Sequence, residues 1–143
     1  MKDKELLNQF TDMTRIHTAY VERRLLHLGV HTGQGSIISA LGERGPSSQK
    51  ELAEYRHVSA ATISVMLRRM ENSGWIVRGQ SEDGKSNQIS LTAEGQALSA
   101  ALNQDMVGEP ERVFAGLSEE DKRVARRIFL QISENLANMT GNG

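Results

Sequence analysis

The segment SAATISVMLRRMENSGWIVR, residues 59–78, changes from a helical to an extended pattern within a short span. Ser59 is a residue type that caps helix N-termini. At 100° per residue, one stripe of the following helix carries the apolar side chains Ile63, Met66, Leu67 and Met70. After Gly74 the pattern becomes β-branched and aromatic, as in a short strand. The segment therefore predicts a capped amphipathic helix followed directly by a strand.

The face of this helix opposite the apolar stripe has short side chains near its start and arginines near its end. It carries Ala61, Ser64, Val65, Arg68 and Asn72, with Thr62 and Arg69 at its flanks. Short side chains let the backbone approach a surface, and hydroxyls and unpaired N–H groups suit phosphate oxygens or base edges. Arginines can reach guanine edges, and a valine can contact a thymine methyl. A solvated helix face is the alternative, so the neighbouring elements matter.

The elements around this helix follow from the same criteria. Before it we predict a helix over 4–28, a helix that begins at 32–34 and ends by 42–45, and a short helix capped by Ser47 or Ser48. After it we predict strands over 75–78 and 88–91 joined by the polar loop 81–87, a helix capped by Thr92 and weakened or kinked at 108–110, and a last helix beginning at 117–120. Residues 139–143 are expected to fray.

This order of elements predicts a mainly α (α+β) fold. Residues 33–93 form a winged helix-turn-helix lobe within a single domain, residues 1–143. The flanking helices in 1–32 and 94–143 need an apolar partner, and so small a chain offers little surface to cover them. We therefore expect these helices to form the dimerisation region of a homodimer.

Composition excludes several classes of function. The 143-residue chain has a formal net charge of -1 and no cysteine, which excludes disulfides, thiolate metal sites and cysteine nucleophiles. No apolar run approaches the ~20 residues of a membrane span, and the N-terminus lacks the apolar core of a signal peptide, so we expect a soluble, cytoplasmic protein. No carboxylate pair, nucleophile–base pattern or phosphate loop is evident; an enzyme or a cofactor is not expected.

The histidines do not predict a metal site. His27 and His31 have a spacing used by metal-binding pairs, but Gly29 lies between them and no nearby carboxylate completes a site. We interpret His57, in the turn before the helix of 59–72, as serving the backbone geometry there or contacting a phosphate.

The segments GQGSIISAL (33–41), SQKELAEYRHVSAATISVMLRRMENSGWIVR (48–78) and ISLTAEG (89–95) resemble the MarR family of winged-helix transcription regulators. The resemblance covers essentially the whole chain. It implies a dimer on a palindromic double-stranded DNA operator, with one recognition helix per half-site in the major groove and each wing tip at the adjacent minor groove. Helix geometry and resemblance together select the DNA-binding residues Ser48, Gln49, Ser59, Ala61, Thr62, Ser64, Val65, Arg68, Arg69, Arg78, Asp83 and Lys85.

Two positions depart from the family pattern. Family wings often carry Asp-x-Arg at the tip, whereas this chain has Asp83-Gly84-Lys85. Lysine lacks the planar fork of arginine, so the minor-groove shape would be read less sharply, and whether Lys85 enters that groove stays open. Val65 occupies a position that is often polar or basic, so the contact there would be apolar.

The resemblance also implies a ligand. Many family members release DNA on binding small aromatic or phenolic anions in a crevice beside the dimerisation helices. Arg15, His17 and Tyr20 on the first helix are candidate effector-binding residues, with solvated or interface positions as the alternative for each. The overall expectation is a homodimeric repressor released by a small molecule. The alternative is a winged-helix module whose fourth helix docks on a protein instead of DNA.

Overall fold

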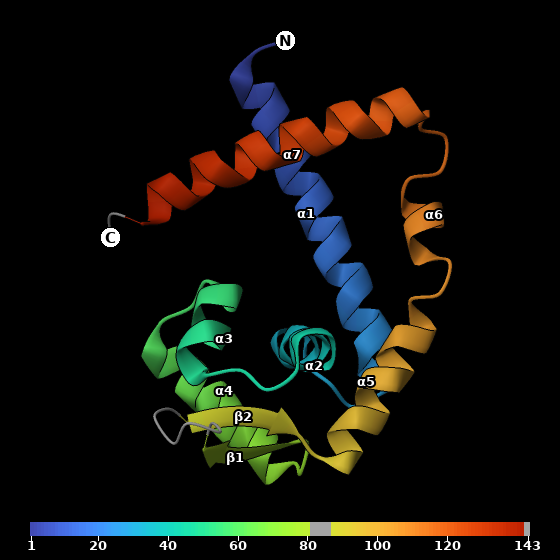
Figure 1. Ribbon diagram of the computed structural model, residues 1–143. Helices are drawn as coiled ribbons and strands as arrows, with labels where there is room; N and C mark the ends of the chain where they lie inside the picture. Colours follow the sequence, from blue (N-terminus) through green and yellow to red (C-terminus); the bar gives the residue numbers. More distant parts are fainter. Residues whose placement is uncertain (81–86, 142–143) are drawn as a thin grey trace. The chain divides into compact units, whose positions relative to one another are not determined.

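The computed structural model describes residues 1–80 and 87–141 and is mainly helical, with one small sheet (Figure 1). Its elements are α1 (Asp3–Leu26), α2 (Thr32–Arg44), α3 (Gln49–Arg56), α4 (Ala60–Asn72), β1 (Ile76–Gln80), β2 (Asn87–Leu91), α5 (Ala93–Asp105), α6 (Glu109–Val113) and α7 (Glu119–Thr140). This confirms the predicted α+β winged helix-turn-helix architecture. The chain divides into two compact units, Met1–Asp105 and Met106–Gly143, which are described separately below.

The core of the first unit is built around α2, which contacts α1, α3, α4, α5 and β2. Its residues Ile37 and Ile38 are fully buried. The helix does not stop at Gly42: it continues to Arg44 and ends at Gly45, whose φ is 78°, within the predicted range 42–45. Gly42 serves packing instead: a Cβ there would collide with the Ser99 hydroxyl of α5, so the missing side chain allows α2 and α5 to approach closely.

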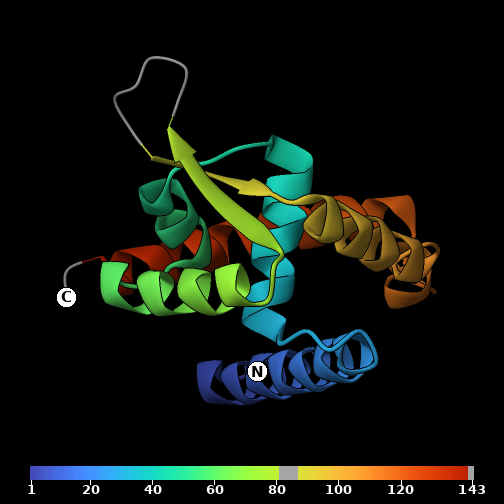
Figure 2. The ribbon, with the colours of Figure 1, turned by 90° about the horizontal axis from the view of Figure 1, so that it is seen from below.

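The wing is an antiparallel pair in which Ile76 lies opposite Leu91 and Arg78 opposite Ile89. Strand β1 covers 76–80, so it begins one residue later and ends two residues later than predicted, and β2 covers 87–91, one residue more than predicted. Ser47 forms an isolated antiparallel bridge with Ile89 of β2: the Ser47 N–H donates to the Ile89 carbonyl at 3.1 Å, and the Ser47 carbonyl accepts from the Ile89 N–H at 2.7 Å. Figure 2 shows β1 lying beside α4, and the two elements are in contact.

Helix α5 is attached to the base of the wing through its first turn. The Thr92 hydroxyl accepts the Gly95 N–H at 3.0 Å, which confirms the predicted cap, and donates to the Gly74 carbonyl at 2.6 Å. The Thr92 N–H donates to the Trp75 carbonyl at 3.0 Å. Gly95 packs so closely on that carbonyl that a Cβ would overlap its oxygen. These contacts fix where α5 leaves the lobe.

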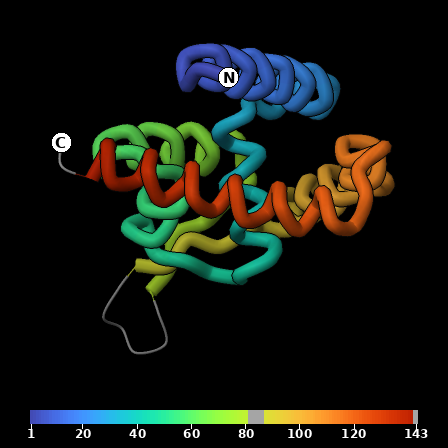
Figure 3. The backbone as a smooth tube through the Cα atoms, turned by 90° about the horizontal axis from the view of Figure 1, so that it is seen from above, coloured from blue at the N-terminus to red at the C-terminus, as the bar shows by residue number. Residues whose placement is uncertain are grey.

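Helix α1 lies along the side of the first unit, as Figure 3 shows, and is held mainly by α2. Only Leu25, near its end, is buried. The helix ends at Leu26, two residues before the predicted end. Four large apolar side chains of its earlier turns are exposed, namely Leu6, Leu7, Met13 and Ile16.

The second unit consists of α6 and α7. The predicted weakness at 108–110 is a true break: α5 already ends at Asp105, and α6 begins at Glu109 with a proline in its first turn. The Ser118 hydroxyl accepts the Asp121 N–H at 3.1 Å, which confirms the predicted start of the last helix. That helix runs to Thr140, so the expected fraying from residue 139 was wrong for 139–140. No residue of α7 is buried.

Candidate nucleic-acid interface

Helix α4 is anchored by its apolar stripe. Ile63, Leu67 and Met70 are completely inaccessible to solvent within the first unit. The Ser59 hydroxyl accepts the Thr62 N–H at 3.1 Å and donates to the Thr62 hydroxyl at 3.0 Å. Ser59 is thus occupied as the cap, whereas the Thr62 hydroxyl accepts this bond and keeps its own hydrogen for another partner. The anchored stripe presents the opposite face of α4 outward.

The outward face of α4 matches the predicted set. Ala61, Thr62, Arg68 and Arg69 are exposed, Ser64 is half-buried, and Val65 is 45% exposed. Neither arginine forms an ion pair with any residue in 1–80 or 87–141. The two guanidinium groups, which have no carboxylate partner among these residues, lie on the same helix face as short side chains. This combination suits a polyanion that approaches the helix closely.

The start of α3 is a second element of this surface. The Ser48 hydroxyl accepts the Glu51 N–H at 3.0 Å, and the Ser48 N–H donates to Oε1 of Glu51 at 3.0 Å. The backbone N–H and then the hydroxyl of Ser48 hold the pKa of Glu51 below its ordinary value. Of the two predicted caps, Ser48 is the one observed, and Ser47 is buried in the sheet.

Arg78 of β1 is placed differently from the arginines of α4. Its Nη1 donates to Oε1 of Gln49 at 2.9 Å, and its Nε lies 3.6 Å from Oε2 of Glu71. The structure therefore brings two predicted DNA-binding residues, Arg78 and Gln49, into direct contact with each other. The predicted wing-tip residues Asp83 and Lys85 lie outside the described residues.

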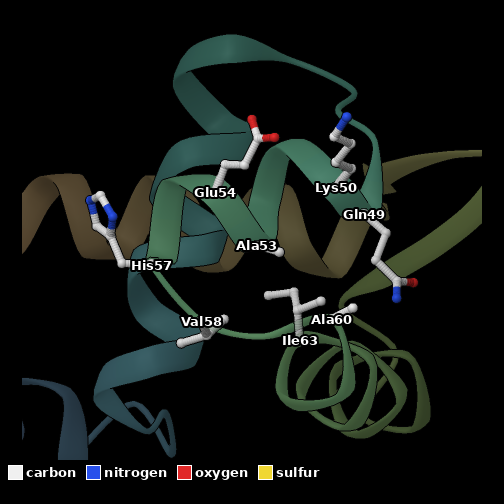
Figure 4. A pocket seen from close by; sticks show the side chains of 8 residues that line it. All are labelled: Gln49, Lys50, Ala53, Glu54, His57, Val58, Ala60 and Ile63. Atoms are coloured by element: carbon white, nitrogen blue, oxygen red, sulfur yellow. The ribbon is translucent and has the colours of Figure 1, made fainter. Parts of the chain in front are cut away.

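A groove of about 620 Å³ separates α3 from the start of α4 (Figure 4). Its lining combines apolar and polar side chains: Gln49, Lys50, Ala53, Glu54, His57, Val58, Ala60 and Ile63. His57 ends α3 in the left-handed conformation, with φ 54° and ψ 44°, which confirms its role in the turn geometry. Lys50 was not among the predicted residues, and its position one residue beyond Gln49 in the first turn of α3 is the signal that could have indicated it.

The three candidate effector residues do not converge. Arg15 pairs with Asp12 at 2.8 Å, and Tyr20 lies under the Arg24 guanidinium at 5.9 Å from its ring centre. An open hollow on α1 includes Arg15 but neither His17 nor Tyr20. All three are exposed on one helix, so their role in ligand binding stays a prediction.

His27 has a carboxylate partner that its local sequence does not reveal. Its Nε2 lies 3.1 Å from Oδ2 of Asp105, which joins the end of α1 to the end of α5. Within residues 1–80 and 87–141, no group of three or more potential ligand side chains could hold a metal ion. None of the helices formed by these residues is long and apolar enough to span a bilayer.

Comparison with known proteins places these features in a family. The MarR family model matches residues 32–86, which include α2, α3, α4 and β1. The chain is 28% identical over 127 residues to the HTH-type transcriptional regulator YwoH of Bacillus subtilis, covering 89% of this chain and 93% of that protein. It is 32% identical over 105 residues to an HTH-type transcriptional regulator of Bacillus cereus, covering 73% of this chain and 70% of the relative.

A solved structure shares the fold over nearly the full length. It is a MarR family regulator from Listeria monocytogenes in complex with a 26mer DNA, with a TM-score of 0.82 and 20% identity, covering 98% of this chain and 93% of that one. The family model, the relatives and the winged helix-turn-helix architecture agree. The chain belongs to the MarR family of transcription regulators.

Proposed function

We propose that this MarR-family regulator is a homodimeric repressor that binds a palindromic operator and is released by a small aromatic or phenolic anion. The observation that carries the proposal is the outward face of α4, where Ala61, Thr62 and Val65 are exposed beside Arg68 and Arg69, which form no ion pair with residues 1–80 or 87–141. This surface suits the major groove, in which short side chains allow close approach and arginines bind guanine edges.

The start of α3 supports the same interface. Ser48 caps this helix, and a helix N-terminus presents unpaired backbone N–H groups that bind phosphate oxygens. Lys50, exposed in the same turn, adds a cation. The Listeria protein with the same fold was solved in complex with a 26mer DNA. We therefore propose that α4 contacts the bases while the start of α3 binds the phosphate backbone of the DNA. This function places the protein in the cytoplasm, where the DNA is.

Exposed apolar side chains support a homodimer. In α1, Ile16 is 70% exposed and Leu7 is 60% exposed. In α7, Leu130 is 55% exposed, and the helix has no buried residue at all. Such apolar stripes need a covering surface, and residues 1–32 and 94–143 would supply it from two subunits. A two-fold symmetric dimer presents two equivalent α4 helices, and its operator is expected to be an inverted repeat.

A gel shift at two salt concentrations tests the proposal. The probe is a duplex selected from a random pool by the wild-type protein, with an unselected duplex as control. We expect preference for the selected duplex and a steep fall in affinity with salt, because cationic side chains release counterions from phosphates. A flat salt dependence with no preference for the selected duplex would support the protein-docking alternative. Adding salicylate, a phenolic anion, to the bound complex tests effector release.

A further inference from the structure

We propose that Arg78 does not contact DNA but orients the amide of Gln49 so that its NH2 group faces the phosphate backbone. The inference rests on the proposed DNA-binding function and gives Arg78 a different role from Arg68 and Arg69. Arg68 and Arg69 bind the nucleic acid, whereas Arg78 is a positioning residue. Its role is to connect the wing, the start of α3 and the end of α4.

The Arg78 side chain of β1 contacts one residue of α3 and one residue of α4. From β1, its Nη1 donates to Oε1 of Gln49, the first residue of α3, at 2.9 Å. Its Nε lies 3.6 Å from Oε2 of Glu71, in the last turn of α4. The Arg78 side chain is 33% exposed, and that of Glu71 is 41% exposed. The guanidinium is thus oriented by two partners from two helices, and the Glu71 carboxylate offsets part of its charge.

The chemistry of the two groups decides how Gln49 is oriented. A guanidinium has donors only, so the amide oxygen of Gln49 must be the atom that faces it. The NH2 group of Gln49 is then directed to another partner, and it offers two donors. Figure 4 shows the Gln49 side chain extending away from α3 at the end of the groove. Gln49 also belongs to the first turn of α3, where backbone N–H groups have no partner within the helix. A phosphate oxygen accepts hydrogen bonds from both kinds of donor.

Arg78 would lose its present contacts if it bound a phosphate itself. Binding DNA would require the guanidinium to leave the Gln49 oxygen and the Glu71 carboxylate. Arg68 and Arg69 have no such competing partner among residues 1–80 and 87–141. Lysine could not replace Arg78, because an ammonium cannot hold two groups in a fixed planar geometry.

The test is a double-variant cycle on DNA affinity, measured by fluorescence anisotropy with the selected duplex at several salt concentrations. The four proteins are wild type, Arg78→Met, Gln49→Ala and the double variant, compared at a temperature at which circular dichroism shows all four folded. We expect Arg78→Met to weaken binding about tenfold, as loss of a charge-assisted hydrogen bond predicts, with an unchanged salt slope. In the Gln49→Ala background, Arg78→Met should have no further effect.

Two controls separate positioning from direct contact. Lys50→Ala, which removes the cation proposed to lie at the phosphate backbone, should reduce the salt slope by about 1. Arg78→Lys keeps the charge and should weaken binding as much as Arg78→Met. A reduced slope for Arg78→Met, rescue of affinity by Arg78→Lys, or independent effects of the two substitutions would each overturn the inference. Failure of the wild-type protein to bind any duplex would instead overturn the proposed function.

Discussion

Substitution of Gly95 by alanine tests the attachment of α5 to the wing. The sign of the change in the free energy of unfolding separates the local effect of helix propensity from the tertiary effect of close packing. Within a helix, Gly→Ala normally stabilises by about 1 kcal/mol. Here an added Cβ would overlap the Trp75 carbonyl oxygen and lie 3.0 Å from its carbon and 3.1 Å from Cδ2 of Leu91. Because the carbonyl belongs to the backbone, relief requires α5 or the β1 start to move.

The expected magnitude follows from these contacts. Overpacking against backbone costs about 3 kcal/mol. Displacing the Trp75 carbonyl also weakens its bond from the Thr92 N–H, worth about 1 kcal/mol. The helix-propensity gain of about 1 kcal/mol is subtracted from these two costs, so the free energy of unfolding should fall by about 3 kcal/mol. For a chain of this size, that loss lowers the melting temperature by roughly 10 °C.

Chemical denaturation and thermal melts of Gly95→Ala measure this loss against a matched control. Gly79→Ala in β1 is suitable, since a Cβ there meets no atom within 4 Å. It should change stability by no more than about 0.5 kcal/mol. If Gly95→Ala were as stable as the wild type or more stable, helix propensity would dominate and the close packing of α5 on the wing base would be refuted.

Three further predictions concern the DNA surface, the dimer and pH. Arg68→Ala should cost about 1–3 kcal/mol of binding free energy and relax specificity at one base pair. Lys85→Ala should weaken binding to all sequences similarly and lower the salt slope; if both affinity and slope are unchanged, the wing does not contact the DNA. Ile16→Glu should shift the protein from dimer to monomer in light scattering, because it places a charge on the exposed apolar face of α1. The Ser48 N–H and hydroxyl lower the pKa of Glu51. The ionised Glu51 carboxylate therefore stabilises the fold at pH values above the ordinary glutamate pKa, and this stabilisation is lost as pH falls through the folded-state pKa. Glu51→Gln should make the free energy of unfolding decline less steeply between neutral and acidic pH, as denaturation at several pH values would show.

Local signals explain which features could be predicted. The caps at Ser48, Ser59, Thr92 and Ser118 depend on a side chain and an N–H three residues later, so a short window contains all the relevant atoms. The apolar stripe of α4 likewise depends only on helical spacing, which is why its outward face was identified correctly.

Features that depend on distant partners could not be predicted from short windows. Two glycines follow the buried part of α2: Gly42 lies within the helix, where it makes room for Ser99 of α5, and Gly45 ends the helix. No carboxylate near His27 in the sequence completes a metal site, yet the fold brings the Asp105 carboxylate to His27 from the end of α5. Such pairs are separated by many residues, and no periodicity in the sequence specifies them.

The sequence by itself determined the order of the elements apart from the short helix α6, the caps of α3, α4, α5 and α7, and the face of α4 that lies outward, because each follows from contacts within a few residues. Only the tertiary structure decided the position of Arg78, which pairs with Gln49 across 29 residues of sequence. An arginine two residues into a strand is equally compatible with a phosphate contact or an internal bond. The fold selects the internal bond, since it places the Gln49 amide oxygen at the start of α3 and the Glu71 carboxylate at the end of α4 within reach of the Arg78 guanidinium.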